Sequence, residues 1–246
     1  MNGNFRKEIL KILNNQVFQS ILYSPFLDYH EWYLLKFVKN EAEKIKNTES
    51  ILDIGAGELR YKKYFDHCKY ISNDLCIGDK DWYFEKIDIK STIYNIPVGN
   101  NSFDNILCTQ ALEHIEFPEE AFKEFHRILK KGGKLILSAP LGFGEHQIPH
   151  DYYRYTRYAL INLGKRNHLK LISLDPHGGI FINLEYILWQ SFSESTLFKK
   201  NLIFRYIIFI ILLPVKLFSG IIFCALDLLD KNKRYTLNYN CIYKKL

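Results

Sequence analysis

Residues 51–60 read ILDIGAGELR, and this stretch decides the fold class. An apolar run containing Asp53 gives way to Gly55 and Gly57, which predicts a buried strand feeding a tight turn, because glycine allows positive φ and close backbone approach. We expect a helix to begin near Glu58. Bare N–H groups of the turn and the positive helix end would then cradle the polar part of a nucleotide-like ligand. An ordinary strand-to-helix turn has the same pattern, so the downstream sequence must decide.

The composition describes one globular domain with room for an appendage. The chain has 246 residues, of which 48% are hydrophobic and 24% charged, enough for a large core. Its five cysteines lack the paired C-x-x-C spacing, so neither a zinc site nor a disulfide framework is predicted. We expect a reducing compartment, and the N-terminus shows no secretory signal.

The positive charge is concentrated near the C-terminus. Residues 196–246 hold nine Lys or Arg and two acids, a balance of +7, while the whole chain carries +6. The rest is therefore close to neutral, whereas a nucleic-acid binder would spread basic residues over its main domain. Basic residues beside the most apolar segment favour a membrane surface instead.

Strand-like and helical runs alternate along the chain. The segment 29–46 is amphipathic, and 118–130 begins with Pro118 and ends at a Gly132-Gly133 break. Strands are predicted at 50–54, 69–73, 84–88, 104–109, 134–139, 169–174 and 238–245. This order predicts an α/β fold with a mostly parallel sheet that has helices on both faces.

Polar residues follow several of these strands. Asp74 lies about 20 residues beyond the glycine turn, where an acid can accept both hydroxyl protons of a ribose. Asp88 ends the third predicted strand and Gln110 follows the fourth. Ligands of open parallel sheets bind at the carboxyl ends of the strands, so these residues are expected at one edge.

The stretches ILDIGAGELR, ISNDL, DIKSTIYNIPVGNNSFDNILCTQALEHI and RILKKGGKLILSAP resemble the class I S-adenosylmethionine (SAM)-dependent methyltransferases, type 11-like. The resemblance covers roughly residues 48–175 and 238–245. It implies a Rossmann-like sheet of seven strands, the last one antiparallel, and SAM as the cofactor. An apolar helical insertion would precede the last strand.

The resemblance also implies roles for individual residues. Gly55, Ala56 and Gly57 would line the methionine and ribose end of SAM, with Asp53 supporting the turn. Asp74 would hold the ribose hydroxyls, Asp88 the adenine amino group, and Ile89 would cover the adenine. Gln110 and Leu112 would flank the methionine part. A dinucleotide site is disfavoured, since position 60 is Arg where that fingerprint has glycine.

The loop at 140–160 crowds polar side chains into a few residues. His146 and His150 are the candidate bases because imidazole titrates near neutrality, with Asp151 to orient one of them. Glu145, Tyr153 and Arg154 are candidate substrate contacts. The loop could equally be a polar cap for a helix that begins near Thr156, with Arg154 simply paired to Asp151. We predict no metal site, because the spacing of Glu145, His146 and His150 does not support one.

Residues 202–229 form the most apolar segment. Two short helices broken at Pro214-Val215-Lys216 are expected, dipping into one leaflet while Lys199, Lys200, Lys231, Lys233 and Arg234 face lipid phosphates. A lid over the site or a dimer interface are the alternatives. The predicted organisation is a helical cap at 1–47, a SAM-binding core at 48–177, the insertion at 178–236 and a final core strand at 237–246.

These observations predict a SAM-dependent methyltransferase, cytoplasmic and peripheral on the cytoplasmic face of the membrane. Its expected acceptor is a hydroxyl of a sugar or a lipid-linked glycan. The alternatives are a methyltransferase for a quinone or another apolar small molecule, and a SAM-binding partner protein without catalysis.

Overall fold

The computed structural model describes residues 24–78, 84–194 and 202–246. The first 23 residues of the predicted cap, and Lys199 and Lys200, lie outside these ranges. The chain divides into two units, one of Met1–Leu35 with His177–Thr236 and one of Lys36–Pro176 with Leu237–Leu246. Each is described by itself.

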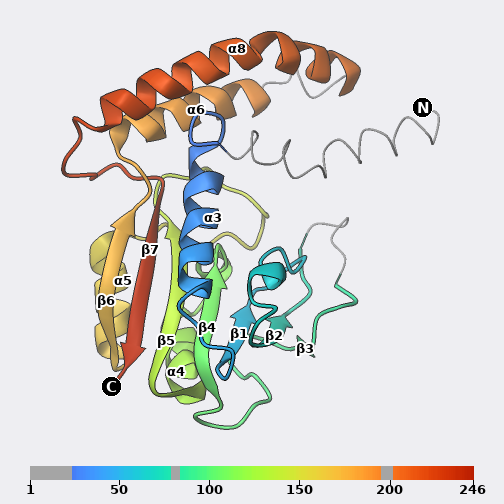
Figure 1. Ribbon diagram of the computed structural model, residues 1–246, viewed down its shortest axis with the longest axis vertical. Helices are drawn as coiled ribbons and strands as arrows, with labels where there is room; N and C mark the ends of the chain where they lie inside the picture. The colour runs from blue at the N-terminus through green and yellow to red at the C-terminus, as the bar shows by residue number, and fades with distance from the viewer. Residues whose placement is uncertain (1–23, 79–83, 195–201) are drawn as a thin grey trace. The chain divides into compact units, whose positions relative to one another are not determined.

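The second unit is built on a seven-stranded sheet with the order β3-β2-β1-β4-β5-β7-β6 (Figure 1). Strand β7 runs antiparallel to both β5 and β6, and the other pairs are parallel. The predicted Rossmann-like fold class is therefore confirmed. The strands are β1 (Ser50–Ile54), β2 (Lys69–Asp74), β3 (Ile89–Lys90), β4 (Phe103–Thr109), β5 (Leu129–Pro140), β6 (Leu169–Pro176) and β7 (Asn238–Lys245).

Two details of the sheet differ from the sequence prediction. No strand forms at 84–88, because the chain turns there, with Ile87 N donating to Phe84 O. The third strand is the short β3 instead. The Gly132-Gly133 pair lies inside β5 and does not precede it. A side chain at Gly133 would lie 2.8 Å from the Asp104 carbonyl oxygen, so glycine allows the strand to continue where the β4–β5 register shifts.

Helices α4 (Pro118–Ile128) and α5 (Arg157–Arg166) lie on one face of this sheet (Figure 1). Helix α4 begins at its proline. Its apolar face buries Phe122 and Phe125, which belong to the hydrophobic core. Helix α5 is capped as predicted, since the Thr156 side chain accepts from Ala159 N at 3.2 Å. Together with the buried strands these helices enclose a single apolar core.

Helix α3 (Tyr29–Ala42) begins in the first unit and ends in the second. It is the helix predicted at 29–46, somewhat shorter than expected. Its residues Val38 and Ala42 are buried, at 0% and 2% exposure.

The first unit contains helices α6 (Ile180–Glu194) and α8 (Leu202–Asp227). The prediction of two short helices was wrong, because α8 continues through Pro214. A proline removes one main-chain hydrogen bond, and contact with α6 offsets that loss: Trp189 Nε1 donates to Ser219 Oγ at 3.1 Å, and Lys216 lies over the Trp189 ring. Within the described ranges, no helix is long and apolar enough to cross a membrane.

Candidate functional site

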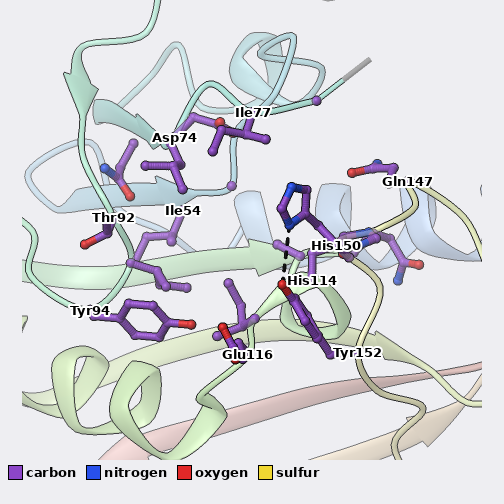
Figure 2. A pocket seen from close by; sticks show the side chains of 18 of the residues that line it. Ile54, Asp74, Ile77, Thr92, Tyr94, His114, Glu116, Gln147, His150 and Tyr152 are labelled. Carbon is purple, nitrogen blue, oxygen red and sulfur yellow. Dashed lines mark hydrogen bonds between the residues drawn. The ribbon is translucent and has the colours of Figure 1, made fainter.

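A cavity of about 360 Å³ opens where β1, β2 and β4 end (Figure 2). This cavity therefore lies where open parallel sheets bind ligands. Its lining comes from five segments of the second unit, represented by Gly55, Asp74, Thr92, Gln110 and His150. The other lining residues include Asn73, Leu75, Ile77, Ser91, Tyr94, Ala111, His114, Glu116, Gln147 and Tyr152.

The glycine turn after β1 approaches the segment after β4. Gly55 has φ +70°, and a side chain there would lie 2.6 Å from the Cβ of Ala111. Glycine is therefore required both by the backbone conformation and by the space. Gly57 also has positive φ, at +50°.

The sequence suggested that the N–H groups of this turn are free to bind a ligand, and this was wrong for two of them. Gly55 N and Ala56 N both donate to the Asn73 carbonyl oxygen, because the parallel register of β1 and β2 brings that oxygen alongside. The helix expected near Glu58 is also absent. Turns lead there to the single 3-10 turn η1 (Lys62–Tyr64), so no helix dipole contributes to the site.

Asp74 joins the turn to the end of β2. Its Oδ2 accepts from Gly57 N at 2.9 Å, and its Oδ1 accepts from Cys76 N at 2.6 Å. Carboxylate oxygens have further lone pairs, so each one can also accept a ligand hydroxyl. The residue lines the cavity, and the amides fix the carboxylate in place.

Gln110 lies at the end of β4 with φ +50°. Its amide Nε2 donates to Ser138 Oγ and to Asn238 Oδ1, both at 2.9 Å. These bonds tie the ends of β4, β5 and β7 together below the cavity. Leu112, predicted to flank the methionine part of SAM, is fully buried in the apolar core.

Five further predicted cofactor residues are not among those that line the cavity: Asp53, Ala56, Gly57, Asp88 and Ile89. Asp53 is 2% exposed and accepts from Tyr70 Oη at 2.6 Å. Burial raises its pKa to about 7, although the bond from Tyr70 opposes the shift. Asp88 Oδ2 accepts from the amide and hydroxyl of Ser72, and Ile89 packs against the core.

The loop after β5 is organised by an ion pair. Arg154 donates from Nη1 to Asp151 Oδ1 at 2.6 Å and from Nη2 to Asp151 Oδ2 at 2.7 Å. The same guanidinium donates to the carbonyl oxygens of Phe143 and Gly144. Hydrogen bonds from Arg154 hold the pKa of Asp151 down at about 2.

The remaining candidates in this loop occupy different places. His150 lines the cavity, and its Nδ1 lies 3.4 Å from Tyr152 Oη (Figure 2). His146 donates its backbone N–H to Asp151 Oδ2 and does not line the cavity. Glu145 is exposed, and Tyr153 Oη donates to the Glu116 carbonyl oxygen at 3.0 Å.

The structure adds residues that the sequence analysis did not select. Leu75 and Ile77 follow Asp74 and are 51% and 57% exposed, which is unusual for such side chains beside a cavity. Tyr94 and Thr92 come from the segment after β3. Only their position, shortly after the end of a strand, could have identified these residues from the sequence.

Glu113 is the most unusual of the residues near the cavity. It lies in the 3-10 turn η2 (Leu112–His114) and is completely buried. Burial raises its pKa to about 8. Its neighbours in the sequence do not predict this burial, because it depends on the packing of distant segments.

The sheet order and the cavity at its carboxyl edge define a Rossmann-like nucleotide-binding architecture of the class I methyltransferase type. Residues 52–137 match the methyltransferase domain family. This segment therefore has the sequence of a methyltransferase domain, and the cofactor of such domains is S-adenosylmethionine.

Comparison with known proteins gives partial relatives. The chain is 30% identical over 105 residues to an uncharacterized protein of Methanocaldococcus jannaschii, covering 42% of this chain and 44% of that one. It is 28% identical over 103 residues to a malonyl-[acyl-carrier protein] O-methyltransferase of Hahella chejuensis, covering 38% and 37%. The matches thus span less than half the length of these relatives.

Among solved structures, the fold is similar to that of the [4+2]-cyclase SpnF, with a TM-score of 0.54 and 13% identity. This match covers 89% of the chain and 82% of the cyclase. The likeness shows a shared fold, and the fold does not by itself fix the reaction.

Proposed function

We propose that this protein transfers a methyl group from SAM to a hydroxyl of a sugar or lipid-linked glycan at the cytoplasmic face of a membrane. One observation carries the proposal. A single cavity joins a fixed carboxylate, Asp74, beside the Gly55 turn to a second end with two imidazoles, His114 and His150. The first end suits the ribose of SAM and the second suits a polar acceptor.

The chemistry asked of the chain is modest. The acceptor oxygen forms a bond to the methyl carbon as the carbon–sulfur bond breaks, and S-adenosylhomocysteine leaves as a neutral thioether. Alignment of the three atoms supplies most of the rate enhancement. His150 is the proposed base that takes the hydroxyl proton, because its ring lines the cavity.

The acceptor end combines Ile115 and Ile148 with several polar groups, and those groups could bond glycan hydroxyls. Glu116, Gln147, His150 and Tyr152 face the cavity there (Figure 2). A quinone pocket would be lined mainly by apolar side chains. The partial match to an O-methyltransferase also favours an oxygen acceptor. A protein that binds SAM without transferring a methyl group is the second candidate. A [4+2]-cyclase has a similar fold, so the fold alone does not require methyl transfer.

Membrane contact is proposed for α8 of the first unit. Ile211, Val215, Phe218 and Ile222 recur at helical spacing and are 65%, 54%, 66% and 39% exposed. Lys216, the charge nearest the middle of this helix, lies over Trp189 of α6. The face formed by these four residues therefore carries no charge. Lys231 and Arg234 follow the helix and are exposed, so they could bind anionic headgroups.

Vesicle sedimentation tests this contact. Phe218→Glu is expected to release the protein from vesicles that contain anionic lipid, because a carboxylate at that position would have to enter the apolar boundary. Tyr158→Glu on α5 is the matched control, since Tyr158 is also exposed, at 73%. Equal sedimentation of the two variants would contradict the contact.

Methyl-labelled SAM tests the activity. The folded protein is incubated with lipid and glycan extracts, and label is expected in the glycan or glycolipid fraction. Asp74→Ala is expected to abolish that label, since charge-assisted hydrogen bonds contribute about 1.5–3 kcal/mol each. Label confined to apolar extracts would favour the quinone alternative, and SAM binding without label in any fraction would favour the non-methylating one.

A further inference from the structure

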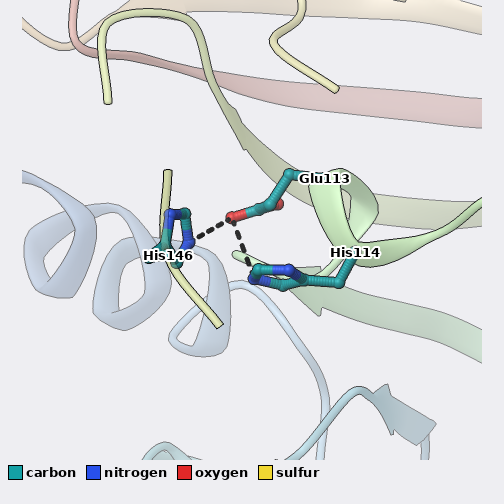
Figure 3. A group of neighbouring side chains, drawn as sticks. All are labelled: Glu113, His114 and His146. Carbon is teal, nitrogen blue, oxygen red and sulfur yellow. Dashed lines mark ion pairs between the residues drawn. The ribbon is translucent and has the colours of Figure 1, made fainter. Parts of the chain in front are cut away.

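A second cluster of chemistry-bearing side chains lies behind the acceptor end of the cavity. Glu113 and His114 come from η2, and His146 comes from the loop after β5 (Figure 3). One ligand-type atom from each of the three side chains lies within 4.8 Å of the others. All three residues belong to the second unit.

Glu113 is buried, and no side chain of the described residues donates a hydrogen bond to its carboxylate. It is 0% exposed, and neither carboxylate oxygen makes a hydrogen bond within the described part of the chain. The same holds there for Nε2 of His114. A buried polar atom that lacks a partner costs about 1–3 kcal/mol, and more when it is charged. Something must therefore offset this cost in the working protein.

The hydrogen bonds of the two imidazoles show which nitrogens face Glu113. His114 Nδ1 lies 2.6 Å from the His150 carbonyl oxygen, and His146 Nδ1 lies 3.1 Å from the Gly144 carbonyl oxygen. A carbonyl oxygen accepts only, so Nδ1 of His114 carries the proton and donates it. His146 Nδ1 does the same when it bonds the Gly144 carbonyl oxygen, which is its shorter contact, since the donor Arg154 Nη2 lies farther away at 3.4 Å. In a neutral ring Nε2 then has a free lone pair.

Both Nε2 atoms are directed at the same oxygen. Glu113 Oε1 lies 3.9 Å from His114 Nε2 and 3.8 Å from His146 Nε2 (Figure 3). These separations are too long for a hydrogen bond, so a shared proton does not explain the arrangement. Three lone-pair donors instead face one another. The nearest guanidinium, Arg154, is already paired with Asp151.

We propose that Glu113, His114 and His146 bind a divalent transition-metal ion, with Zn²⁺ the best match. Two imidazoles and one carboxylate form a known ligand type for zinc sites with an open position. Ligands about 2.1 Å from a tetrahedral ion lie roughly 3.4 Å apart, so the two pairs that include Glu113 need to close by about 0.4–0.5 Å. The widest separation in the cluster, up to 4.8 Å, needs to close by about 1.4 Å. His146 is 36% exposed and has room to move.

The environment of the ligands fits this assignment. A metal-bound imidazole usually donates its other N–H to a carbonyl or carboxylate, and both rings do so here. The set differs from the Glu145, His146 and His150 grouping, because Glu145 is exposed and His150 lies beside Tyr152.

The place of the ion suggests its use, and this part rests on the proposed function. His114 lines the cavity, so an open coordination position would lie beside the acceptor. A bound ion lowers the pKa of a coordinated hydroxyl and orients its oxygen. The ligand shell would then position the acceptor for attack on the methyl group.

Equilibrium dialysis with elemental analysis tests the site. The full-length protein is stripped with a chelator and titrated with Zn²⁺, and separately with Co²⁺, whose visible absorption reports coordination. One ion per chain is expected. Glu113→Gln and His146→Asn should each weaken binding by at least the roughly 100-fold that loss of a supporting group can cost.

His150→Asn is the matched control, because it removes a neighbouring imidazole and keeps the carbonyl oxygen that holds His114. Its metal affinity should be unchanged. His146 lies on a partly exposed loop, so His146→Asn stays decisive even if Glu113→Gln lowers stability. No metal binding by the folded protein, or metal binding that survives both substitutions, would overturn the proposal.

SAM titration of the same sample separates the metal site from the proposed function. Metal binding without SAM binding would refute only the proposed function, and SAM binding without metal binding would refute only the metal site.

Discussion

The two ends of the cavity are built by different means. At the end assigned to SAM the main chain does the shaping, with Gly55 and Gln110 at positive φ and two amides holding Asp74. At the acceptor end side chains do it, through the Arg154–Asp151 pair and the carbonyl oxygens that Arg154 bonds. Backbone changes should therefore alter cofactor affinity, whereas loop changes should alter turnover.

Gly55→Ala is expected to have the largest effect on SAM affinity. Its Cβ would lie 2.6 Å from that of Ala111, at a φ of +70° that alanine rarely adopts. Overpacking of this kind costs about 1–3 kcal/mol, so SAM affinity should fall by roughly 5- to 150-fold in a calorimetric titration.

Gly99→Ala is the control for that change, since a side chain there would meet nothing within 4 Å. Adding Ala111→Gly to the Gly55→Ala variant should restore part of the affinity by removing the clash. Full affinity in Gly55→Ala itself would show that the turn does not shape the cofactor end.

Arg154→Lys is expected to separate the two ends. Lysine cannot donate from a planar fork, so the loop should lose its bidentate pair and two carbonyl contacts. Misplacement of acceptor groups should lower methyl transfer by about 10- to 100-fold, with SAM affinity unchanged. Arg166→Lys, at an exposed pair with Glu119, is the control. If Arg154→Lys lowered only SAM affinity, the loop would belong to the SAM end of the cavity and not to the acceptor end.

Asp53→Asn is expected to change stability and its pH dependence. Burial raises the pKa of Asp53 to about 7, above the ordinary value near 4, so the folded state favours the protonated acid. Stability present at low pH is then lost as pH rises through about 7. The neutral variant does not lose this stability, so between pH 5 and pH 8 its free energy of unfolding should gain on that of the natural chain by an amount on the order of 1–3 kcal/mol. Tm measured across that pH range follows the gain.

Asp88→Asn is expected to change the pH dependence of stability in the opposite direction. Hydrogen bonds from Ser72 lower the pKa of Asp88 despite some burial, so its contribution is present at neutral pH and lost only in acid. A Tm gap for Asp53→Asn that stays constant across pH would mean that Asp53 remains ionised in the fold.

The sequence predicted most of the sheet because long apolar runs carry a strong signal. Strands β1, β4, β6 and β7 lie where the runs lie. The short β3 could not be found this way, since two residues carry no period. Pro214 predicted a helix break, and contact between α8 and α6 overrode that local preference.

The candidate site was less predictable because its side chains are placed by tertiary contacts. Gly55, Asp74 and Gln110 were selected for following a strand, and all three line the cavity. The sequence does not show that Asn73 supplies the carbonyl oxygen that satisfies the turn, because this depends on the β1–β2 register. Burial of Glu113 against His146 depends on a loop 33 positions away, which no local pattern encodes.

Calorimetric titration of SAM, and of S-adenosylhomocysteine, into the folded protein tests the central claim most directly. The account predicts saturable binding of one molecule per chain, strongly weakened in Asp74→Ala and unchanged in Gly99→Ala. Absence of binding heat for both ligands across several temperatures, with the protein shown to be folded, would contradict it.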